Sequence, residues 1–183
     1  MAVLDITTKA LPEGVFALDP AHSSVVFEVK HLGIATVRGR FIVISGSVTG
    51  GDSPSLEGVV GIASATTFDE QRDGHLASPD FFDAQRFPEA TFRSTSFDQL
   101  EDGSVRVVGD LTLKGVTKEI ELTGSVAGPA TDPWGGERVA LELSGVVDRN
   151  DFGVKWNAPL PGGGFLLPDE VRIVIDVSAV KGK

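Results

Sequence analysis

The fold is decided by one stretch near the middle of the chain, VRVVGDLTLKGVTKEIELTGSV, residues 105–126. Apolar and polar side chains alternate along 105–113 and again along 118–126, and successive side chains of a strand point to opposite faces. Lys114-Gly115 lies between the two runs and gives a turn signal, because glycine accepts backbone angles that other residues avoid. The stretch therefore predicts an antiparallel hairpin with one apolar and one polar face.

The same alternation extends in both directions along the chain. It predicts strands at 14–19, 23–31, 37–47, 55–65, 89–98, 104–113, 118–127, 137–149 and 169–179. Turn signals separate strands at 50–54, 101–103, 114–115 and 128–129. No long amphipathic helical pattern is present to cover the shared apolar face. The sheet must therefore fold that face onto itself, as a sandwich or as a closed barrel without exposed edges.

Composition narrows the possible functions. A net charge of -10 without a cluster of Lys or Arg disfavours nucleic acid and a general affinity for anionic membranes. The absence of cysteine excludes disulfides and thiolate catalysis. The first thirteen residues lack the pattern of a secretory signal, and no segment is long enough to span a bilayer, so we expect a cytoplasmic protein that is not an integral membrane protein. We expect one domain, residues 14–183, after an N-terminal extension, residues 1–13.

Two segments do not follow the strand pattern. In the first, residues 66–88, Ser78 is suited to begin a short helix with Pro79 in its first turn, and Phe87-Pro88 ends it. We expect this helical turn to hold three apolar side chains over one end of the barrel, those of Leu76, Phe81 and Phe82. The second segment, residues 150–168, is rich in apolar residues, which either cover a barrel opening or plug its core.

Short sequence motifs follow one another in a fixed order along nearly the whole chain from Gly14 onward. They are Asp19-Pro20-x-His22-Ser23, His31-Leu32-Gly33, Gly39-x-Phe41, Arg72-Asp73-x-His75-Leu76, Asp80-Phe81-Phe82, Gly109-Asp110-Leu111-x-Leu113-x-Gly115, Arg149-x-Asp151-Phe152-Gly153 and Asp169-Glu170-Val171. In this order they resemble the YceI-like family of lipid- and polyisoprenoid-binding barrels. The resemblance implies an all-β fold, an extended antiparallel eight-stranded lipocalin-like β-barrel with a short helical segment capping one end. It also implies a homodimer, because related proteins are often dimeric.

The candidate ligand-binding residues are apolar. Alternation and the cap place toward the interior Phe27, Val29, Phe41, Val43, Phe92, Leu111, Leu113, Leu141, Phe81 and Phe82. Eleven phenylalanines and no tyrosine give an aromatic interior without polar groups, which suits a hydrocarbon better than it suits catalysis. An eight-stranded barrel is either packed solid or able to hold one small ligand, and the residues alone leave both open. The resemblance favours a cavity.

Polar candidates gather in the 72–83 segment. Arg72 and His75 are the candidate contacts for a ligand head group, because arginine binds phosphate or carbonyl oxygen well. The alternative is that Arg72 and Asp73 only fix the loop onto neighbouring strands. His22, His31 and His75 lack the spacing of helix-borne metal ligands, so we expect no metal and no cofactor.

The resulting hypothesis is non-catalytic binding, as storage, sequestration or transport, of a long-chain lipid in an apolar barrel cavity. The resemblance implies a polyisoprenoid or an isoprenoid quinone as this lipid. Two other functions stay open. One is an enzyme acting on a lipid or quinone at the barrel mouth through Arg72, Asp73 and His75. The other is a packed, stress-related domain without a ligand.

Overall fold

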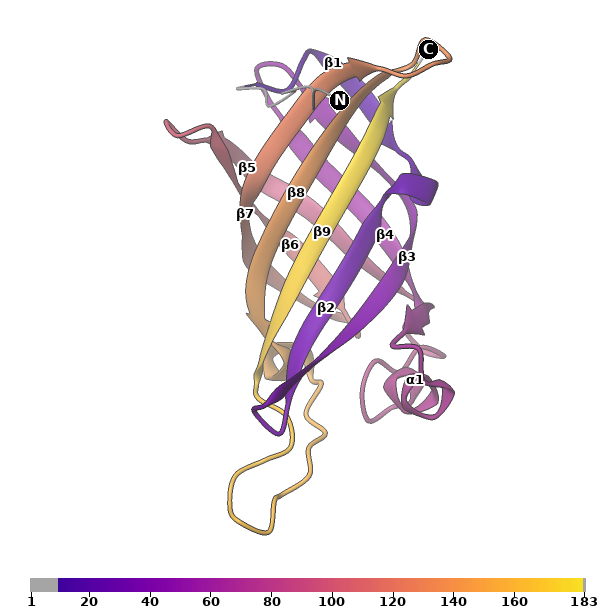
Figure 1. Cartoon of the computed structure of the whole chain (residues 1–183), viewed down its shortest axis with the longest axis vertical. Coiled ribbons are helices and arrows are strands. Elements are labelled where there is room, and N and C mark those ends of the chain that lie inside the picture. Colours follow the sequence, from indigo (N-terminus) through magenta and orange to yellow (C-terminus); the bar gives the residue numbers. More distant parts are fainter. Residues whose placement is uncertain (1–9, 183) are drawn as a thin grey trace, which may run out of the picture.

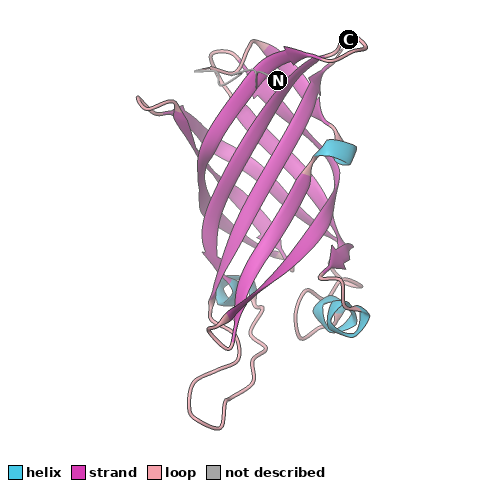
Figure 2. Cartoon of the chain, in the orientation of Figure 1, coloured by secondary structure: helices cyan, strands magenta, loops and turns pink. Residues whose placement is uncertain are grey.

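One antiparallel sheet forms nearly all of the fold, and its two ends meet to close a barrel (Figure 1 and Figure 2). The computed structural model describes residues 10–182. Its strands are β1 (Gly14–Leu18), β2 (Ser24–His31), β3 (Ala35–Gly50), β4 (Ser55–Thr66), β5 (Glu89–Gln99), β6 (Ser104–Leu113), β7 (Val116–Thr131), β8 (Glu137–Asp148) and β9 (Glu170–Lys181). Each strand from β2 to β9 pairs with the next, and β9 pairs with β2. The predicted closed antiparallel barrel is confirmed.

The strands β1 and β2 together occupy one position of the barrel. Both pair with β3 on one side and with β9 on the other. On β9, β1 pairs near the C-terminal end and β2 pairs nearer the N-terminal end. A short 3-10 turn, Pro20–His22, interrupts them. The nine strands of the described residues therefore fill eight positions, as the eight-stranded prediction requires.

The chain reverses at the predicted turns, with one exception. Gly128-Pro129 does not end a strand but lies inside β7, where the register with β8 shifts between Ala127 and Ala130. Proline has no N–H to give to a ladder, so a bulge accommodates it without losing the strand. The turn follows at Asp132, whose carboxylate accepts hydrogen bonds from two backbone N–H groups, those of Trp134 and Gly136.

The predicted helix exists, but its position differs from the expectation. The helix α1 spans Glu70–Ala77, and Asp69 is its N-cap, accepting a hydrogen bond from the backbone N–H of Arg72. Ser78 is its C-cap in an extended conformation, not the residue that begins it. The reason is Pro79, which disfavours the α region for the residue before it. The helix therefore stops at the Ser-Pro pair that was expected to start it.

The interior divides into two clusters along the barrel axis. The end that carries the β3–β4, β5–β6 and β7–β8 turns holds one cluster of buried side chains, which includes Phe16, Val105, Leu122 and Leu141. The opposite end carries α1 and the long segment between β8 and β9 (Figure 1). Here the second cluster mixes strand residues such as Phe41 with residues of the connecting segments. We call these the packed end and the mouth end.

The expected N-terminal extension falls partly outside the described residues, which begin at Ala10. The described part lies against the packed end: Leu11 is buried in its core, and the Gly51 N–H donates to the Leu11 carbonyl at 3.3 Å. A β-carbon at Gly50 would collide with the Pro12 carbonyl, so glycine permits this close approach. Among residues 10–182, no helix has the length and apolar character needed to cross a bilayer.

Candidate functional site

A cavity of about 180 Å³ lies inside the mouth half of the barrel. Its walls come from the inward faces of the strands, because period-two alternation turns one apolar face of each strand inward. The cap closes it with Leu76, Phe81 and Phe82. Among the described lining residues, only Thr91 and Arg149 carry polar side chains.

Nine of the ten apolar residues predicted for the interior line this cavity. They are Phe27, Val29, Phe41, Val43, Phe92, Leu111, Leu113, Phe81 and Phe82. Leu141 does not line it, since it lies fully buried in the packed end, paired in register with Val126 and Val177. Alternation shows which face a side chain takes but not how far along the barrel axis it lies, so Leu141 was assigned to the correct face and the wrong half.

Three phenylalanine rings meet where the cap enters the barrel. Phe82 of the cap packs edge-on against Phe41 of β3, with ring centroids 5.5 Å apart, and against Phe27 of β2 at 6.0 Å. Phe27 and Phe41 are 5.4 Å apart. The Phe27 ring lies directly over Gly39, its cross-strand partner, where any β-carbon would collide with the ring. Gly39 therefore sets the position of the ring that separates cavity from mouth.

Lys114 joins the two cap segments. The β6–β7 turn places its ammonium so that Nζ donates to the Pro79 carbonyl at 2.8 Å and to the Gly153 carbonyl at 3.3 Å. Pro79 belongs to the α1–β5 segment and Gly153 to the β8–β9 segment. One half-buried side chain thus holds both covers against the end of the barrel.

Arg149 was not predicted as a site residue from the sequence, although it belongs to the Arg149-x-Asp151-Phe152-Gly153 motif. This buried arginine donates from Nη1 to the carbonyls of Val154 and Trp156, at 2.7 and 2.9 Å, and from Nε to Pro168 at 2.8 Å. It therefore shapes the base of the β8–β9 segment, which brings Phe152 and Val154 into the cavity wall. The motif draws attention to Arg149 in the sequence, but only the fold shows which carbonyl groups its guanidinium binds.

A groove of about 420 Å³ lies outside the cavity, between α1, β2 and the β8–β9 segment. Five side chains line both spaces: Phe27, Val29, Leu76, Phe81 and Leu167. The cavity and the groove are therefore separated by a single layer of apolar side chains. The groove also has a polar part, to which Gln71, Arg72, His75 and His31 contribute.

Arg72 and Asp73 fix the start of α1, as the alternative interpretation expected. Arg72 donates from Nε to Thr67 Oγ1 at 2.7 Å and from Nη2 to the Thr67 carbonyl at 3.0 Å. Asp73 accepts from the hydroxyls of Thr66 and Thr67 and from the Thr67 backbone. Burial would raise the pKa of Asp73, but these hydrogen bonds outweigh it and lower the pKa below its ordinary value.

His75 lies in an aromatic cluster at the groove. Its ring is edge-on to Phe81, with centroids 5.0 Å apart, and to Trp156 at 4.8 Å. Its Nε2 lies 2.9 Å from Asp80 Oδ2. The structure thus brings both candidate head-group residues, Arg72 and His75, to the wall of one groove.

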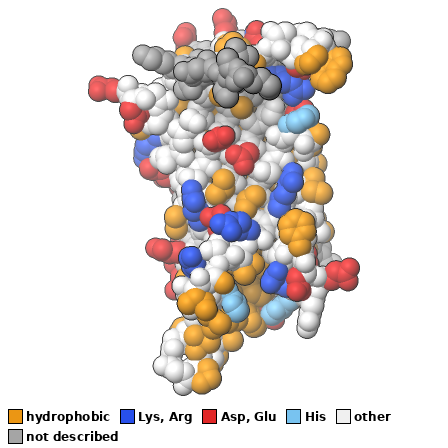
Figure 3. All heavy atoms as spheres, viewed as in Figure 1, with side chains coloured by type: hydrophobic (Ala, Val, Ile, Leu, Met, Phe, Trp, Pro, Cys, Tyr) orange, Lys and Arg blue, Asp and Glu red, His pale blue; other side chains and the backbone are white. Residues whose placement is uncertain are grey.

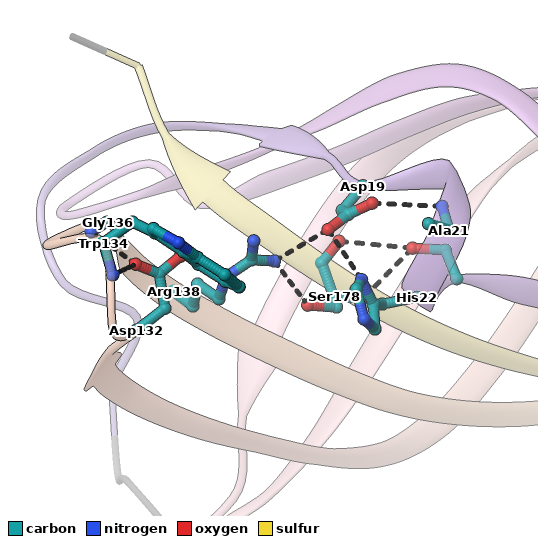
Figure 4. A network of polar contacts seen from close by, with 9 residues as sticks. Asp19, Ala21, His22, Asp132, Trp134, Gly136, Arg138 and Ser178 are labelled. Atoms are coloured by element: carbon teal, nitrogen blue, oxygen red, sulfur yellow. Dashed lines mark hydrogen bonds and ion pairs between the residues drawn. The ribbon is translucent and has the colours of Figure 1, made fainter.

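A second polar cluster lies away from the mouth, around Asp19 (Figure 4). Asp19 Oδ2 accepts from Arg138 Nη1 at 2.8 Å and lies 2.8 Å from His22 Nδ1. The hydrogen bond from Arg138, followed by that from His22, lowers the pKa of Asp19 to about 2. Arg138 also donates to Asp132 at 2.9 Å. The cluster ties the break between β1 and β2 to β8, so its role is structural.

No group of three or more His, Cys, Asp or Glu side chains within residues 10–182 is arranged to hold a metal ion. His22 belongs to the Asp19 cluster, whereas His31 and His75 line the groove.

The sequence model of the YceI-like domain family matches residues 16–179 of this chain. The UPF0312 protein VPA0850 of Vibrio parahaemolyticus is 36% identical over 174 residues, which cover 90% of each chain. The crystal structure of BcnA from Burkholderia cenocepacia superposes with a TM-score of 0.73 and 23% identity, covering 88% of this chain and 99% of that one. A domain of Saccharophagus degradans, described as polyisoprenoid binding, superposes with a TM-score of 0.70 and 15% identity, covering 91% and 98%. At these identities the two structures support the fold.

Proposed function

We propose that this chain, which belongs to the YceI-like family, binds a long-chain lipid in the barrel cavity without transforming it, and that the lipid is a polyisoprenoid or an isoprenoid quinone. One observation carries the proposal: the cavity is enclosed by a barrel and lined almost entirely by aliphatic and phenylalanine side chains. Such walls offer a hydrocarbon its preferred surroundings and offer few groups for acid–base chemistry. The description of the Saccharophagus degradans domain supports the choice of lipid.

The energetics suit an isoprenoid tail. Each buried CH₂ contributes about 0.8 kcal/mol, so a five-carbon isoprene unit contributes a few kcal/mol. A handful of buried units approaches the practical limit of non-covalent affinity of about -18 to -21 kcal/mol. Strong contacts to the head group are therefore not required for tight binding.

The size of the cavity requires the cap to move. An apolar cavity of about 150 Å³ takes a single benzene molecule, and the cavity here is about 180 Å³. A chain of several isoprene units needs the rings of Phe27, Phe41 and Phe82 to separate. Because only one layer of side chains divides the cavity from the groove, that separation would join the two spaces into a longer channel.

In the joined channel the tail occupies the cavity and the head group lies in the groove. Arg72 and His75 line that groove and would contact the oxygens of a head group. The hydrogen bonds from Arg72 to Thr67 leave Nη1 without a partner among the described residues, so it can donate to a ligand.

Val29 gives the most direct test, because its side chain lines both spaces. We expect Val29→Trp to block uptake of a fluorescent prenyl alcohol while the barrel stays folded, at an overpacking cost of about 1–3 kcal/mol. Val146→Trp is the control, since Val146 is 58% exposed on the outside of β8. Unchanged affinity in a folded Val29→Trp variant would contradict the site. Conversion of the prenyl alcohol by the unsubstituted protein would contradict the non-catalytic function.

A further inference from the structure

Two neighbouring tips at the mouth end carry no charged residue. The β2–β3 turn is free of Asp, Glu, Lys and Arg from His31 to Val37, and the segment between β8 and β9 is free of them from Trp156 to Pro168. Nearly a quarter of the whole chain is charged, so runs of this length stand out. Their exposed members are apolar: Ile34 is 81% exposed and Phe165 is 66% exposed. We call these two tips the apolar rim.

The apolar rim is ordered by its own hydrogen bonds. The Leu32 N–H donates to the Leu166 carbonyl at 3.0 Å and links the two tips. Within the longer tip, Pro159 and Phe165 form a β-bridge, and the Leu160 N–H donates to the Gly164 carbonyl at 3.0 Å. This tip extends well beyond the barrel (Figure 1), and apolar side chains gather on it (Figure 3). The apolar groups are thus held outward in a fixed arrangement.

Basic side chains next to the apolar rim are suited to contact the phosphate groups of a bilayer. Lys30 flanks the shorter tip and Lys155 precedes the longer one, whereas the nearby Arg38 guanidinium is paired with Glu28 at 2.7 Å. Lys155 is exposed and forms no ion pair among the described residues. Apolar side chains at the tip with basic groups directly behind them form the pattern of a segment that enters the interface of a bilayer. The acidic character of the whole chain argues that insertion of apolar groups, rather than long-range attraction, supplies the binding.

The rim also borders the groove. Val37 comes from the shorter tip, and Trp156 and Leu166 come from the longer one, and all three line the groove. We propose that the apolar rim docks the mouth end onto a phospholipid bilayer, with Ile34 and Phe165 among the acyl chains and Lys155 at the phosphates. The groove then opens toward the membrane, and an apolar ligand enters or leaves without crossing water. This surface goes beyond the proposed function, because it specifies where the ligand is exchanged.

Flotation of the full chain with dioleoylphosphatidylcholine vesicles tests the proposal. We expect the protein to bind, and the double variant Ile34→Ser, Phe165→Ser to bind at least about tenfold more weakly, since both apolar side chains would be lost. Trp134→Ser is the matched control, because Trp134 is 86% exposed in the β7–β8 turn at the packed end. Its binding should stay within about twofold of the unsubstituted protein. Failure of the unsubstituted protein to bind, or equal losses in both variants, would overturn the proposal.

A second measurement separates docking from ligand binding. In vesicle-free solution the double variant should bind a fluorescent prenyl alcohol as the unsubstituted protein does, whereas transfer of that alcohol between vesicles should slow. If the unsubstituted protein binds vesicles but no prenyl alcohol, docking stands and the proposed function fails. If the double variant instead converts a dimer into a monomer and vesicle binding is unchanged, the rim is an interface between two copies and docking is wrong.

Discussion

At the scale of single residues, the Asp19-Pro20-x-His22-Ser23 motif shows how one carboxylate supports a break in a strand. The barrel position shared by β1 and β2 is interrupted at Pro20–His22, so ladder bonds are lost there. Asp19 Oδ1 caps the turn through the Ala21 N–H at 3.0 Å, and Oδ2 binds Arg138. Ser23 Oγ accepts from the Ser178 N–H at 3.1 Å. Side chains thus replace the missing ladder bonds with contacts to both β8 and β9.

Replacement of Asp19 should make stability depend on pH in a defined direction. The pKa of Asp19 is lowered from 3.8 to about 2 by Arg138 and His22. Because the folded pKa lies below the unfolded one, the stabilisation is complete above about pH 4 and is lost as pH falls toward 2. We expect Asp19→Asn to lower the free energy of unfolding at pH 7 by about 1–2 kcal/mol after solvent screening. Urea unfolding should show this difference shrinking between pH 4 and pH 2.

The control for this series is Asp52→Asn, since Asp52 is exposed in the β3–β4 turn and has no ion pair in the described part of the chain. Asp52→Asn should change the free energy of unfolding only slightly at both pH 4 and pH 2. If the Asp19→Asn deficit keeps its full size at pH 2, the loss comes from the cap geometry and not from the charge.

Arg72 allows a second test at this scale, directed at the head group. We expect Arg72→Ala to weaken binding of a prenyl pyrophosphate by about 1.5–3 kcal/mol and to leave the matching prenyl alcohol much less affected, because a charged hydrogen bond is lost and apolar burial is kept. Arg86→Ala is the control, since Arg86 belongs to the same cap segment but does not line the groove. Titration calorimetry measures both. Equal losses for the two ligands would indicate a damaged mouth rather than a lost contact.

At the scale of elements, the cap is the part of the fold best suited to move. The helix α1 has eight residues, too few to be stable alone, and contains Gly74. Lys114 fixes the segment that follows α1 through one exposed ammonium group. The strands, by contrast, are held on both sides by ladders. Opening of the cap therefore costs less than opening of the barrel.

Two substitutions should shift this opening in opposite directions. A β-carbon at Gly74 meets no atom within 4 Å, so Gly74→Ala should stabilise α1 by about 0.5–1 kcal/mol. Lys114→Met removes the bonds to Pro79 and Gly153 and should loosen both covers. Amide hydrogen exchange should show less protection in residues 70–87 than in residues 105–113. Compared with the unsubstituted protein, protection of residues 70–87 should increase in Gly74→Ala and decrease in Lys114→Met. Uptake of a prenyl alcohol should be slower in Gly74→Ala and faster in Lys114→Met. Equal protection of 70–87 and 105–113, unaffected by either variant, would exclude a gate.

At the scale of the whole molecule, the barrel combines a solid half with a hollow half. The packed end supplies stability through side chains that are almost completely buried, and this allows the mouth end to keep a movable cover. The proposed domain, residues 14–183, includes both halves. The chain before it takes part as well, because Leu11 belongs to the packed core.

We also predict a homodimer. Sedimentation at high protein concentration should show particles of twice the 19.2 kDa mass of the chain. A lasting two-fold interface should bury about 1,200–2,000 Å². The double variant Ile34→Ser, Phe165→Ser should remain dimeric if pairing uses the side of the barrel and the rim is free for a membrane. Only single chains at every concentration would contradict this prediction.

The sequence by itself determined most of the strands and their inward faces, because period-two alternation is a local property that each strand carries in its own residues. The residues left a sandwich and a barrel open, and the pairing of β2 with β9 decides for the barrel. The sequence also predicted the inward positions of nine residues that line the cavity, and it distinguished the two segments at the mouth end from the strands. Three features depended on the tertiary structure. The depth of Leu141 is set by register with neighbouring strands, the course of the β8–β9 segment by the carbonyls that converge on Arg149, and the groove by three separate segments meeting at one end. Each arises from contacts between residues far apart in the chain, which no local pattern records.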